Sequence, residues 1–205
     1  RLNAVGRLDD MSLGVASLLC PDLTLARQLA SQMDNLNQER KEIEQGMQSE
    51  ALAALDAQIR QQGDLPSALV LYQDDWHQGV VGLVASRIKE RFFRPVFAFA
   101  DADEQEVKGS GRSIPGLHLR DALERIDSRH PGLISRFGGH AMAAGLTLPR
   151  ANLPQFESAL VALVADWLAP EQLTGSWLSD GELTAEEFSL ELAQQLREGG
   201  PWGQA

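Results

Sequence analysis

The chain contains a single cysteine, Cys20, among its 205 residues. One cysteine cannot form an internal disulfide, and such sparing use fits the reducing environment of the cytoplasm. No run approaches the roughly 20 apolar residues that a membrane-spanning helix needs, and residues 1–10 show no signal-peptide pattern. We therefore expect a cytoplasmic, globular protein that does not bind a membrane.

Basic residues are also in short supply, because 18 Lys and Arg stand against 29 Asp and Glu, which gives a net charge of -11. This balance argues against a surface that binds nucleic acid indiscriminately. It leaves room for a local basic cleft, since salt screens charges beyond about 8–10 Å. The placement of individual arginines therefore matters more than their number.

Several motifs of catalytic and metal-binding sites are missing. The sequence has no HExxH, GxSxG or GxxxxGK[ST], no cysteine pair, and no dense cluster of Asp and His at ligand spacing. Three carboxylate pairs fall at predicted turns or caps, and we assign no metal to any of them: Asp9 and Asp10, Asp74 and Asp75, and Asp101 and Asp103. The chain is expected to bind rather than to cut, with no metal ligands of its own.

A long polar helix is predicted from Thr24 to about Gln62, where apolar residues recur at spacings of three, four and seven. A helix that is polar on most faces is typical of a connection between domains, although a coiled-coil segment stays open as an alternative. Residues 1–20 resemble the last piece of a preceding domain. Because the chain begins without methionine and ends in GGPWGQA, we expect a fragment of a larger protein.

The middle of the chain predicts an α/β fold, with one mixed sheet flanked by helices. The apolar runs SALVLYQ and RPVFAFAD predict two buried parallel strands that the helix at residues 76–92 connects. Next, EVKGSGRS predicts a strand that ends in a loop, and LHLRDALERID predicts a helix. AMAAGLTLP then predicts a strand, and LPQFESALVALVADWL predicts a final helix. After Pro170 a new hairpin-and-helix pattern begins.

The segment KGSGRSIPG is a candidate anion-binding site. Gly109 and Gly111 would bare backbone amides, and Ser110 and Ser113 would add hydroxyl groups. Arg112 would offer a planar guanidinium that matches two phosphate oxygens at once. The alternative is a Gly-Ser-Gly turn that only links a strand to a helix.

The segment FGGHAMAAG is a second candidate. Gly138 and Gly139 interrupt an apolar run, and glycines weaken a strand, so we expect a ligand or another backbone to come close there. His140 would then present its imidazole beside this ligand, with Arg136 nearby in the sequence. The alternative is a core histidine that a backbone carbonyl satisfies.

Two weaker candidates lie elsewhere. His77 stands at the predicted start of a helix after the first strand, where free amides favour anions. Near the start of the chain, Arg1, Asn3 and Arg7 fall within one short stretch, and we hypothesise that they share a face. For both, ordinary surface charge is the alternative.

Taken in order, RLNAVGR, the long helix, WHQGVVGLVASRIKERFFRPV, GSGRSIPG and FGGHAMAAGLTL resemble the RecJ family of bacterial exonucleases, within the DHH phosphoesterase superfamily. The resemblance covers nearly the whole chain. It implies a larger enzyme that degrades single-stranded DNA from 5′ to 3′ in recombination and repair. The implied parts are the tail of a DHH catalytic domain at 1–22, a connector helix at 23–63, a DHH-associated substrate-binding domain at 64–170 and the truncated start of an oligonucleotide-binding fold at 171–205.

The resemblance also implies roles for the candidate residues. Arg1, Asn3 and Arg7 would border the catalytic site. Ser110, Arg112 and Ser113 would hold the 5′ phosphate. Gly138, Gly139 and His140 would contact the substrate across the cleft from the metals. The parent would use Mn²⁺ or Mg²⁺, held by ligands outside this chain, for two-metal phosphodiester hydrolysis. Since the DHH triplet is absent here, we expect the isolated fragment to be inactive.

Implied partners are single-stranded DNA and, in addition, a single-stranded-DNA-binding protein. Two other functions stay open. One is a sister phosphodiesterase of the same superfamily that acts on oligonucleotides or cyclic dinucleotides. The other is a non-catalytic module that binds nucleic acid or protein, and Asp-rich motifs upstream of Arg1 would distinguish the nuclease from it.

Overall fold

A computed structural model describes residues 1–175, 179 and 181–200 of the chain. It divides into two units, Arg1–Gly175 and Ser176–Ala205. The sheet, the long helix and every predicted site residue belong to the first unit. None of the described helices is long and apolar enough to cross a membrane.

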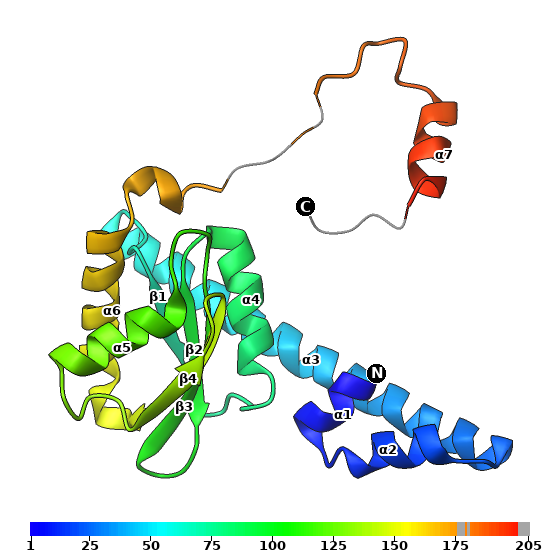
Figure 1. Ribbon diagram of the computed structural model, residues 1–205, viewed down its shortest axis with the longest axis horizontal. Coiled ribbons are helices and arrows are strands. Elements are labelled where there is room, and N and C mark those ends of the chain that lie inside the picture. The colour runs from blue at the N-terminus through cyan, green and yellow to red at the C-terminus, as the bar shows by residue number, and fades with distance from the viewer. Residues whose placement is uncertain (176–178, 180, 201–205) are drawn as a thin grey trace. The chain divides into compact units, whose positions relative to one another are not determined.

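A long helix, α3 (Leu23–Gln62), runs along the first unit and confirms the long helix predicted from the sequence (Figure 1). It begins after Asp22, whose carboxylate accepts a hydrogen bond from the Leu25 amide at 2.7 Å, and ends at Gly63 with φ at +85°. Two short helices, α1 (Leu2–Leu8) and α2 (Ser12–Leu19), pack against it near its start. Further along, α3 packs against α4 and so connects the two parts of this unit.

The sheet has five strands in the order β1-β2-β3-β5-β4. β1 and β2 are parallel, as predicted, and the remaining neighbours are antiparallel. The strands are β1 (Leu69–Tyr72), β2 (Val96–Asp101), β3 (Glu106–Arg112), β4 (Arg136–Gly139) and β5 (Ala143–Pro149). The α/β fold class is confirmed, and β4 is a strand that the sequence analysis did not predict.

The two faces of the sheet are covered differently. Helices α5 (Leu119–Arg129) and α6 (Leu153–Trp167) close one face over a core that contains Phe97, Phe99 and Phe156. On the other face, α4 (Val81–Phe92) lies over β2 and β3, together with α3. On that second face, Gly138 of β4 and Gly145 of β5 are exposed. An open strip of sheet therefore borders the start of α4.

The segment after Pro170 was expected to form a hairpin and a helix, and of these two its described residues contain only the helix. A short 3₁₀ turn spans Pro170–Leu173, and α7 (Leu190–Glu198) confirms the predicted helix. Among residues 179 and 181–200 the structure has a turn and this helix but no strand. The remainder of the predicted hairpin, at 176–178 and 180, lies outside the described residues.

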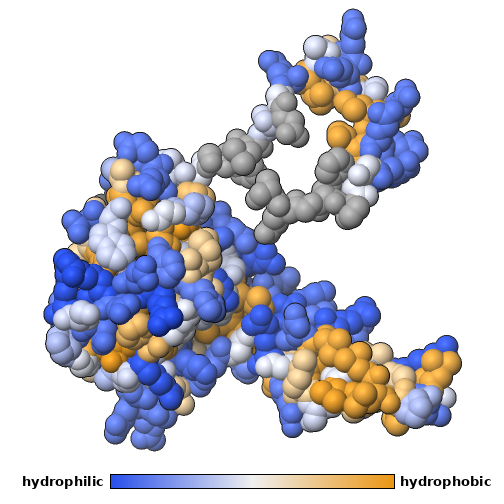
Figure 2. All heavy atoms as spheres, viewed as in Figure 1, coloured by the Kyte–Doolittle hydropathy of each residue, from blue (hydrophilic) through white to orange (hydrophobic). Residues whose placement is uncertain are grey.

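An apolar patch covers α2 and the beginning of α3. Figure 2 shows orange surface gathered over these helices of the first unit. Its large exposed side chains are Met11, Val15, Leu18, Leu19, Leu23 and Leu25. Exposed apolar side chains gathered in this way are typical of surfaces that another protein covers.

Candidate functional site

A pocket of about 300 Å³ lies where α1, the start of α4 and strands β3 and β5 meet. Its lining includes the side chains of Arg7, Gln78, Lys108, Ser110 and Arg112. Residues at the first turn of α4 also border it, and amides at the start of a helix favour anions. Three cationic side chains thus reach one pocket from two separate elements.

Strand geometry sets the position of Arg112. It lies two residues after Ser110 on β3, so both side chains project from the same face of the sheet. The Arg112 guanidinium donates hydrogen bonds to Ser110 Oγ at 2.9 Å and to the Gly111 carbonyl at 2.8 Å. A Cβ atom at Gly82 would lie 2.8 Å from Arg112 Nη2, so α4 approaches this guanidinium as closely as a glycine allows. The serine and the helix together hold the arginine in place.

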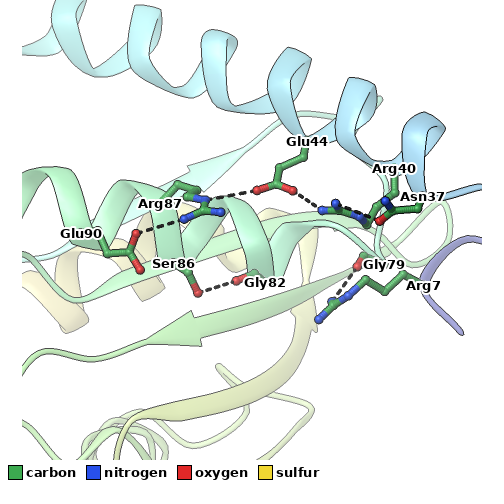
Figure 3. Close-up of polar contacts among 9 residues, drawn as sticks. All are labelled: Arg7, Asn37, Arg40, Glu44, Gly79, Gly82, Ser86, Arg87 and Glu90. Carbon is green, nitrogen blue, oxygen red and sulfur yellow. Dashed lines mark hydrogen bonds and ion pairs between the residues drawn. The ribbon is translucent and has the colours of Figure 1, made fainter. Parts of the chain in front are cut away.

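Arg7 reaches the same pocket from α1. Its Nη1 donates to the Gly79 carbonyl at 3.1 Å, just before α4 begins, as Figure 3 shows. A Cβ atom at Gly79 would lie only 1.9 Å from the carbonyl oxygen of Arg7. Glycine at 79 is therefore what lets the end of α1 come close enough for Arg7 to line the pocket.

The charges in this pocket are not balanced within the chain. Among the described residues, no carboxylate forms an ion pair with Arg7, Lys108 or Arg112. Burial, and secondarily the charge of Arg7, lower the pKa of the Arg112 guanidinium below its ordinary value. An arginine still stays protonated in a protein, so the positive charge persists. A bound anion would offset both the cost of burying the Arg112 charge and its repulsion from Arg7.

A second groove, of about 310 Å³, adjoins the pocket on the open strip of sheet. It lies over β3, β5 and β4 and is lined by Lys108, Arg136, Phe137, Gly138, Gly145 and Thr147. Arg136 Nε donates to Thr147 Oγ1 at 3.1 Å, which fixes the arginine along the sheet. Lys108 and Gly145 border both cavities, so the groove and the pocket lie next to each other.

The predicted amide cradle at Gly109 and Gly111 is wrong. Both glycines lie inside β3, where they face residues of β2 and β5 in the ladder. A Cβ atom at either position would lie 2.4 Å from a phenylalanine ring, Phe99 or Phe97 respectively. The glycines make room for these rings in the core, and the strand does not give way to a loop until after Arg112.

Ser113 is also a poor candidate for binding phosphate. The residue is only 1% exposed, and its hydroxyl donates to the Leu117 carbonyl at 2.7 Å. The hydroxyl is thus used inside the fold, to fix the turn before α5. This corrects the prediction for Ser113, whereas Ser110 lines the pocket as expected.

The glycine-histidine segment forms the turn between β4 and β5. Gly139 has φ at +147°, and a Cβ atom there would lie 2.5 Å from Ala144 Cα, so packing requires this glycine. The His140 amide donates to the Ala143 carbonyl at 2.8 Å, and the residue is exposed, so the core alternative for this histidine is wrong. His140 lies at the same end of the sheet as Arg112, which pairs with Ala143, but it lines neither described cavity.

The remaining candidates are not among the residues that line the pocket. Arg1 forms an ion pair with Asp34 of α3 at 2.8 Å, and Asn3 is exposed one turn before Arg7 on α1. His77 is exposed and its Nδ1 accepts from the Gly79 amide at 3.0 Å, but α4 begins at Val81, five residues after the predicted start at residue 76. Of the early stretch, only Arg7 lines the pocket.

Sequence reasoning missed Gln78, Gly82, Lys108 and Gly145. One of them had a usable signal, because Lys108, Ser110 and Arg112 alternate along a strand and must share a face. The others come from a helix start and a neighbouring strand, which only the packed structure brings together.

The described residues do not fit a metal site. Among them, no group of three or more His, Cys, Asp and Glu side chains is arranged to hold an ion. The polar side chains that line the pocket are instead those of Arg7, Gln78, Lys108, Ser110 and Arg112.

Comparisons with known proteins identify relatives of this chain. Residues 65–169 match the DHHA1 domain family. Over 204 residues the chain is 60% identical to the single-stranded-DNA-specific exonuclease RecJ of Salmonella typhimurium, covering all of this chain and 35% of that protein. The chain thus spans about a third of the length of this curated relative.

Solved structures of RecJ are similar as well. A crystal structure of RecJ from Thermus thermophilus in complex with Mg²⁺ matches with a TM-score of 0.70 and 32% identity, covering 82% of this chain and 24% of that one. A crystal structure of exonuclease RecJ bound to manganese gives the same score and identity, over 83% of this chain and 40% of that one. Both contain much more chain than the residues described above.

Proposed function

Because the chain belongs to the DHHA1 domain family, we propose that it is the substrate-binding part of a metal-dependent exonuclease that degrades single-stranded DNA from 5′ to 3′. Its high identity to a single-stranded-DNA-specific exonuclease over its whole length supports this assignment. The function of this part would be to bind the strand and its 5′ phosphate. Recombination and repair in the cytoplasm would be the setting.

One observation carries the proposal: Arg7, Ser110 and Arg112 converge on one pocket with no acidic partner among the described residues. A terminal phosphate carries more negative charge than one inside a strand and has more free oxygens. Two guanidinium groups can each donate more than one hydrogen bond to such a group. The pocket therefore favours the end of a strand over its middle.

The contribution of this chain to hydrolysis would be positioning. A terminal phosphate held by Arg7 and Arg112 fixes how far the next bond lies from the pocket, which supplies both the polarity and the exonucleolytic character of cleavage. Mn²⁺ or Mg²⁺, which related structures contain, would neutralise charge on the reacting phosphate from a site outside this chain. His140 would contact the substrate from the β4–β5 turn.

The domain roles are part of the same proposal. Residues 1–22 would complete a catalytic domain, and the apolar patch on α2 and the start of α3 supports a large partner surface there. Residues 171–205 would lead into an oligonucleotide-binding fold. A single-stranded-DNA-binding protein would be a further partner of the whole enzyme, and the chain alone would lack nuclease activity.

Binding measurements on this chain test the proposal. Fluorescence anisotropy would compare thymidine oligonucleotides that carry a 5′ phosphate with identical ones that end in a hydroxyl group. We expect Arg112→Ala to weaken binding of the phosphorylated strand by about 1.5–3 kcal/mol, the value of a charge-assisted hydrogen bond, and to affect the other strand far less.

A matched control is Arg120→Ala, which removes the same charge from an exposed position on α5. It should leave both affinities unchanged. Equal losses on the two strands with Arg112→Ala would refute the role in holding the 5′ phosphate. A nuclease assay with Mn²⁺ should show activity for a full-length relative and none for this chain.

A further inference from the structure

Two glycines on the open strip of sheet have no packing reason to be glycine. Gly138 and Gly145 are paired across β4 and β5, and both are exposed. A Cβ atom at Gly138 would meet no atom within 4 Å, and one at Gly145 would meet only the Gly109 carbonyl oxygen, at 3.7 Å. Because a glycine inside a strand costs roughly 0.5–1 kcal/mol relative to alanine, the fold alone would favour a side chain at both positions.

Neighbouring glycines show what a packing requirement looks like. A Cβ atom at Gly109, Gly111 or Gly139 would lie within 2.4–2.5 Å of another atom. These three are explained by the core and by the β4–β5 turn. Gly138 and Gly145 differ from them, and a glycine without such a reason indicates that something from outside approaches the backbone.

The surroundings of this glycine pair define what approaches. One row further along the strands, Lys108, Thr147 and Arg136 are aligned across β3, β5 and β4. Rows on one face of a sheet lie about 6.6–6.8 Å apart along the strands. Lys108 and Arg136 are exposed, and neither has an acidic partner among the residues that the structure describes. The groove thus has an uncharged floor beside two cations.

The floor itself cannot bind an anion. Gly145 lies in the central part of β5, with β3 on one side and β4 on the other, so its backbone groups belong to the ladder. What the glycines offer is van der Waals contact with a flat or compact uncharged group. A ligand that combines such a group with an adjacent negative charge is a nucleotide.

We propose that this groove is a second nucleotide subsite. The sugar and base of the nucleotide after the 5′-terminal one would lie on Gly138 and Gly145, and the phosphate that joins these two nucleotides would contact Lys108 and Arg136. The inference rests on the proposed function, since it extends the strand from the terminal phosphate pocket. Lys108 and Gly145 border both cavities, so a strand can pass from one to the other without leaving the sheet.

Affinity as a function of strand length tests the subsite. NMR titration of the chain would compare 5′-phosphorylated thymidine with the 5′-phosphorylated dinucleotide. We expect the dinucleotide to bind at least roughly tenfold more tightly, as one additional charge-assisted contact implies. In Gly138→Val, whose side chain would stand in the open space above the floor, the two ligands should bind within about twofold of each other.

Two further variants make the result specific. Arg136→Gln should also reduce the advantage of the dinucleotide while leaving binding of the mononucleotide unchanged. Gly46→Ala on α3, where a Cβ atom would meet no atom within 4 Å, should preserve the advantage. Thermal unfolding of Gly138→Val should show no loss of stability, because valine is favoured over glycine in a strand.

The outcomes separate the two proposals. Equal binding of mononucleotide and dinucleotide to the wild-type chain would overturn the second subsite and leave the phosphate pocket standing. A Gly138→Val variant that loses both affinities equally would also overturn it. If neither ligand bound the wild-type chain, the proposed function would be overturned, and the subsite with it.

Discussion

Two pairs of arginines in this protein carry the same charge and have opposite surroundings. Arg40 of α3 and Arg87 of α4 both bind the carboxylate of Glu44 (Figure 3). Arg7 and Arg112 lie beside the beginning of α4, and their partners are two carbonyl oxygens and one hydroxyl group. The first pair is neutralised by a carboxylate of the described chain, and the second is not.

The difference shows what each pair does. The Glu44 carboxylate joins the connector helix to the helix on the sheet, so the first pair stabilises the arrangement of α3 and α4. Carbonyl and hydroxyl oxygens hold Arg7 and Arg112 in place without cancelling their charge. Acidic residues are plentiful in a chain with a net charge of -11, and yet none of the described ones neutralises this second pair. The second pair is suited to an anion that comes from outside.

The largest effect is expected when the second pair receives a carboxylate of its own. In Ser110→Asp the new carboxylate would stand where the serine hydroxyl accepts from Arg112, and would both neutralise the guanidinium and repel a phosphate. We expect binding of a 5′-phosphorylated single strand to weaken by about 3 kcal/mol, measured by fluorescence anisotropy.

The control for that variant is Ser110→Asn, which has nearly the same shape and no charge. It should lose much less affinity. If the two variants weaken binding equally, the shape of the pocket matters and its charge does not, and the contrast between the arginine pairs would have no functional meaning.

The converse change removes the carboxylate from the first pair. Glu44 is 9% exposed, so Glu44→Gln would leave two arginines facing each other at the junction of α3 and α4. We expect the free energy of unfolding to fall by about 2 kcal/mol, between the values for exposed and buried ion pairs. Urea unfolding followed by circular dichroism would measure it.

Glu90→Gln provides the comparison, because Glu90 binds the same Arg87 at 3.4 Å from an exposed position. Its effect should stay below about 1 kcal/mol. Neither variant should change the affinity for a phosphorylated strand. A loss of that affinity in Glu44→Gln would show that the first pair also takes part in binding.

Most of the fold could be predicted from periodicity, but β4 could not. The long helix and the buried strands have strong repeating patterns, and each lies near its predicted place. β4 has only four residues, Arg136–Gly139, and two of them are glycines, which disfavour strands. Its pairing with β5 depends on contacts that a local pattern does not contain.

The site could be predicted in part, and the errors share one cause. Residue chemistry identifies Arg112 and Ser110, but the glycines around them favour a loop, where the structure has a strand. Because alternate residues of a strand point to opposite faces, Gly109 and Gly111 belong to the core and Lys108 joins the pocket. The contribution of Arg7 needs the docking of α1 against Gly79, which no local sequence feature reveals.

The smallest effect in this comparison is expected for Arg7. Glutamine at this position would lose the charge but keep a side-chain amide that can donate a hydrogen bond, so Arg7→Gln should weaken binding of a phosphorylated strand by about 1 kcal/mol. Salt dependence is the sharper measurement. The slope of log K against log salt should fall by about 0.7 when one phosphate of a single strand is no longer neutralised.

Arg1→Gln is the matched control, since Arg1 lies on the same short segment but is already paired with Asp34. Its slope should equal that of the wild-type chain. If Arg7→Gln also kept the wild-type slope, Arg7 would not contact the phosphate, and Arg112 would hold the strand end alone. A smaller slope in Arg7→Gln and an unchanged slope in Arg1→Gln would show that an arginine binds the strand only where no carboxylate of the chain is paired with it.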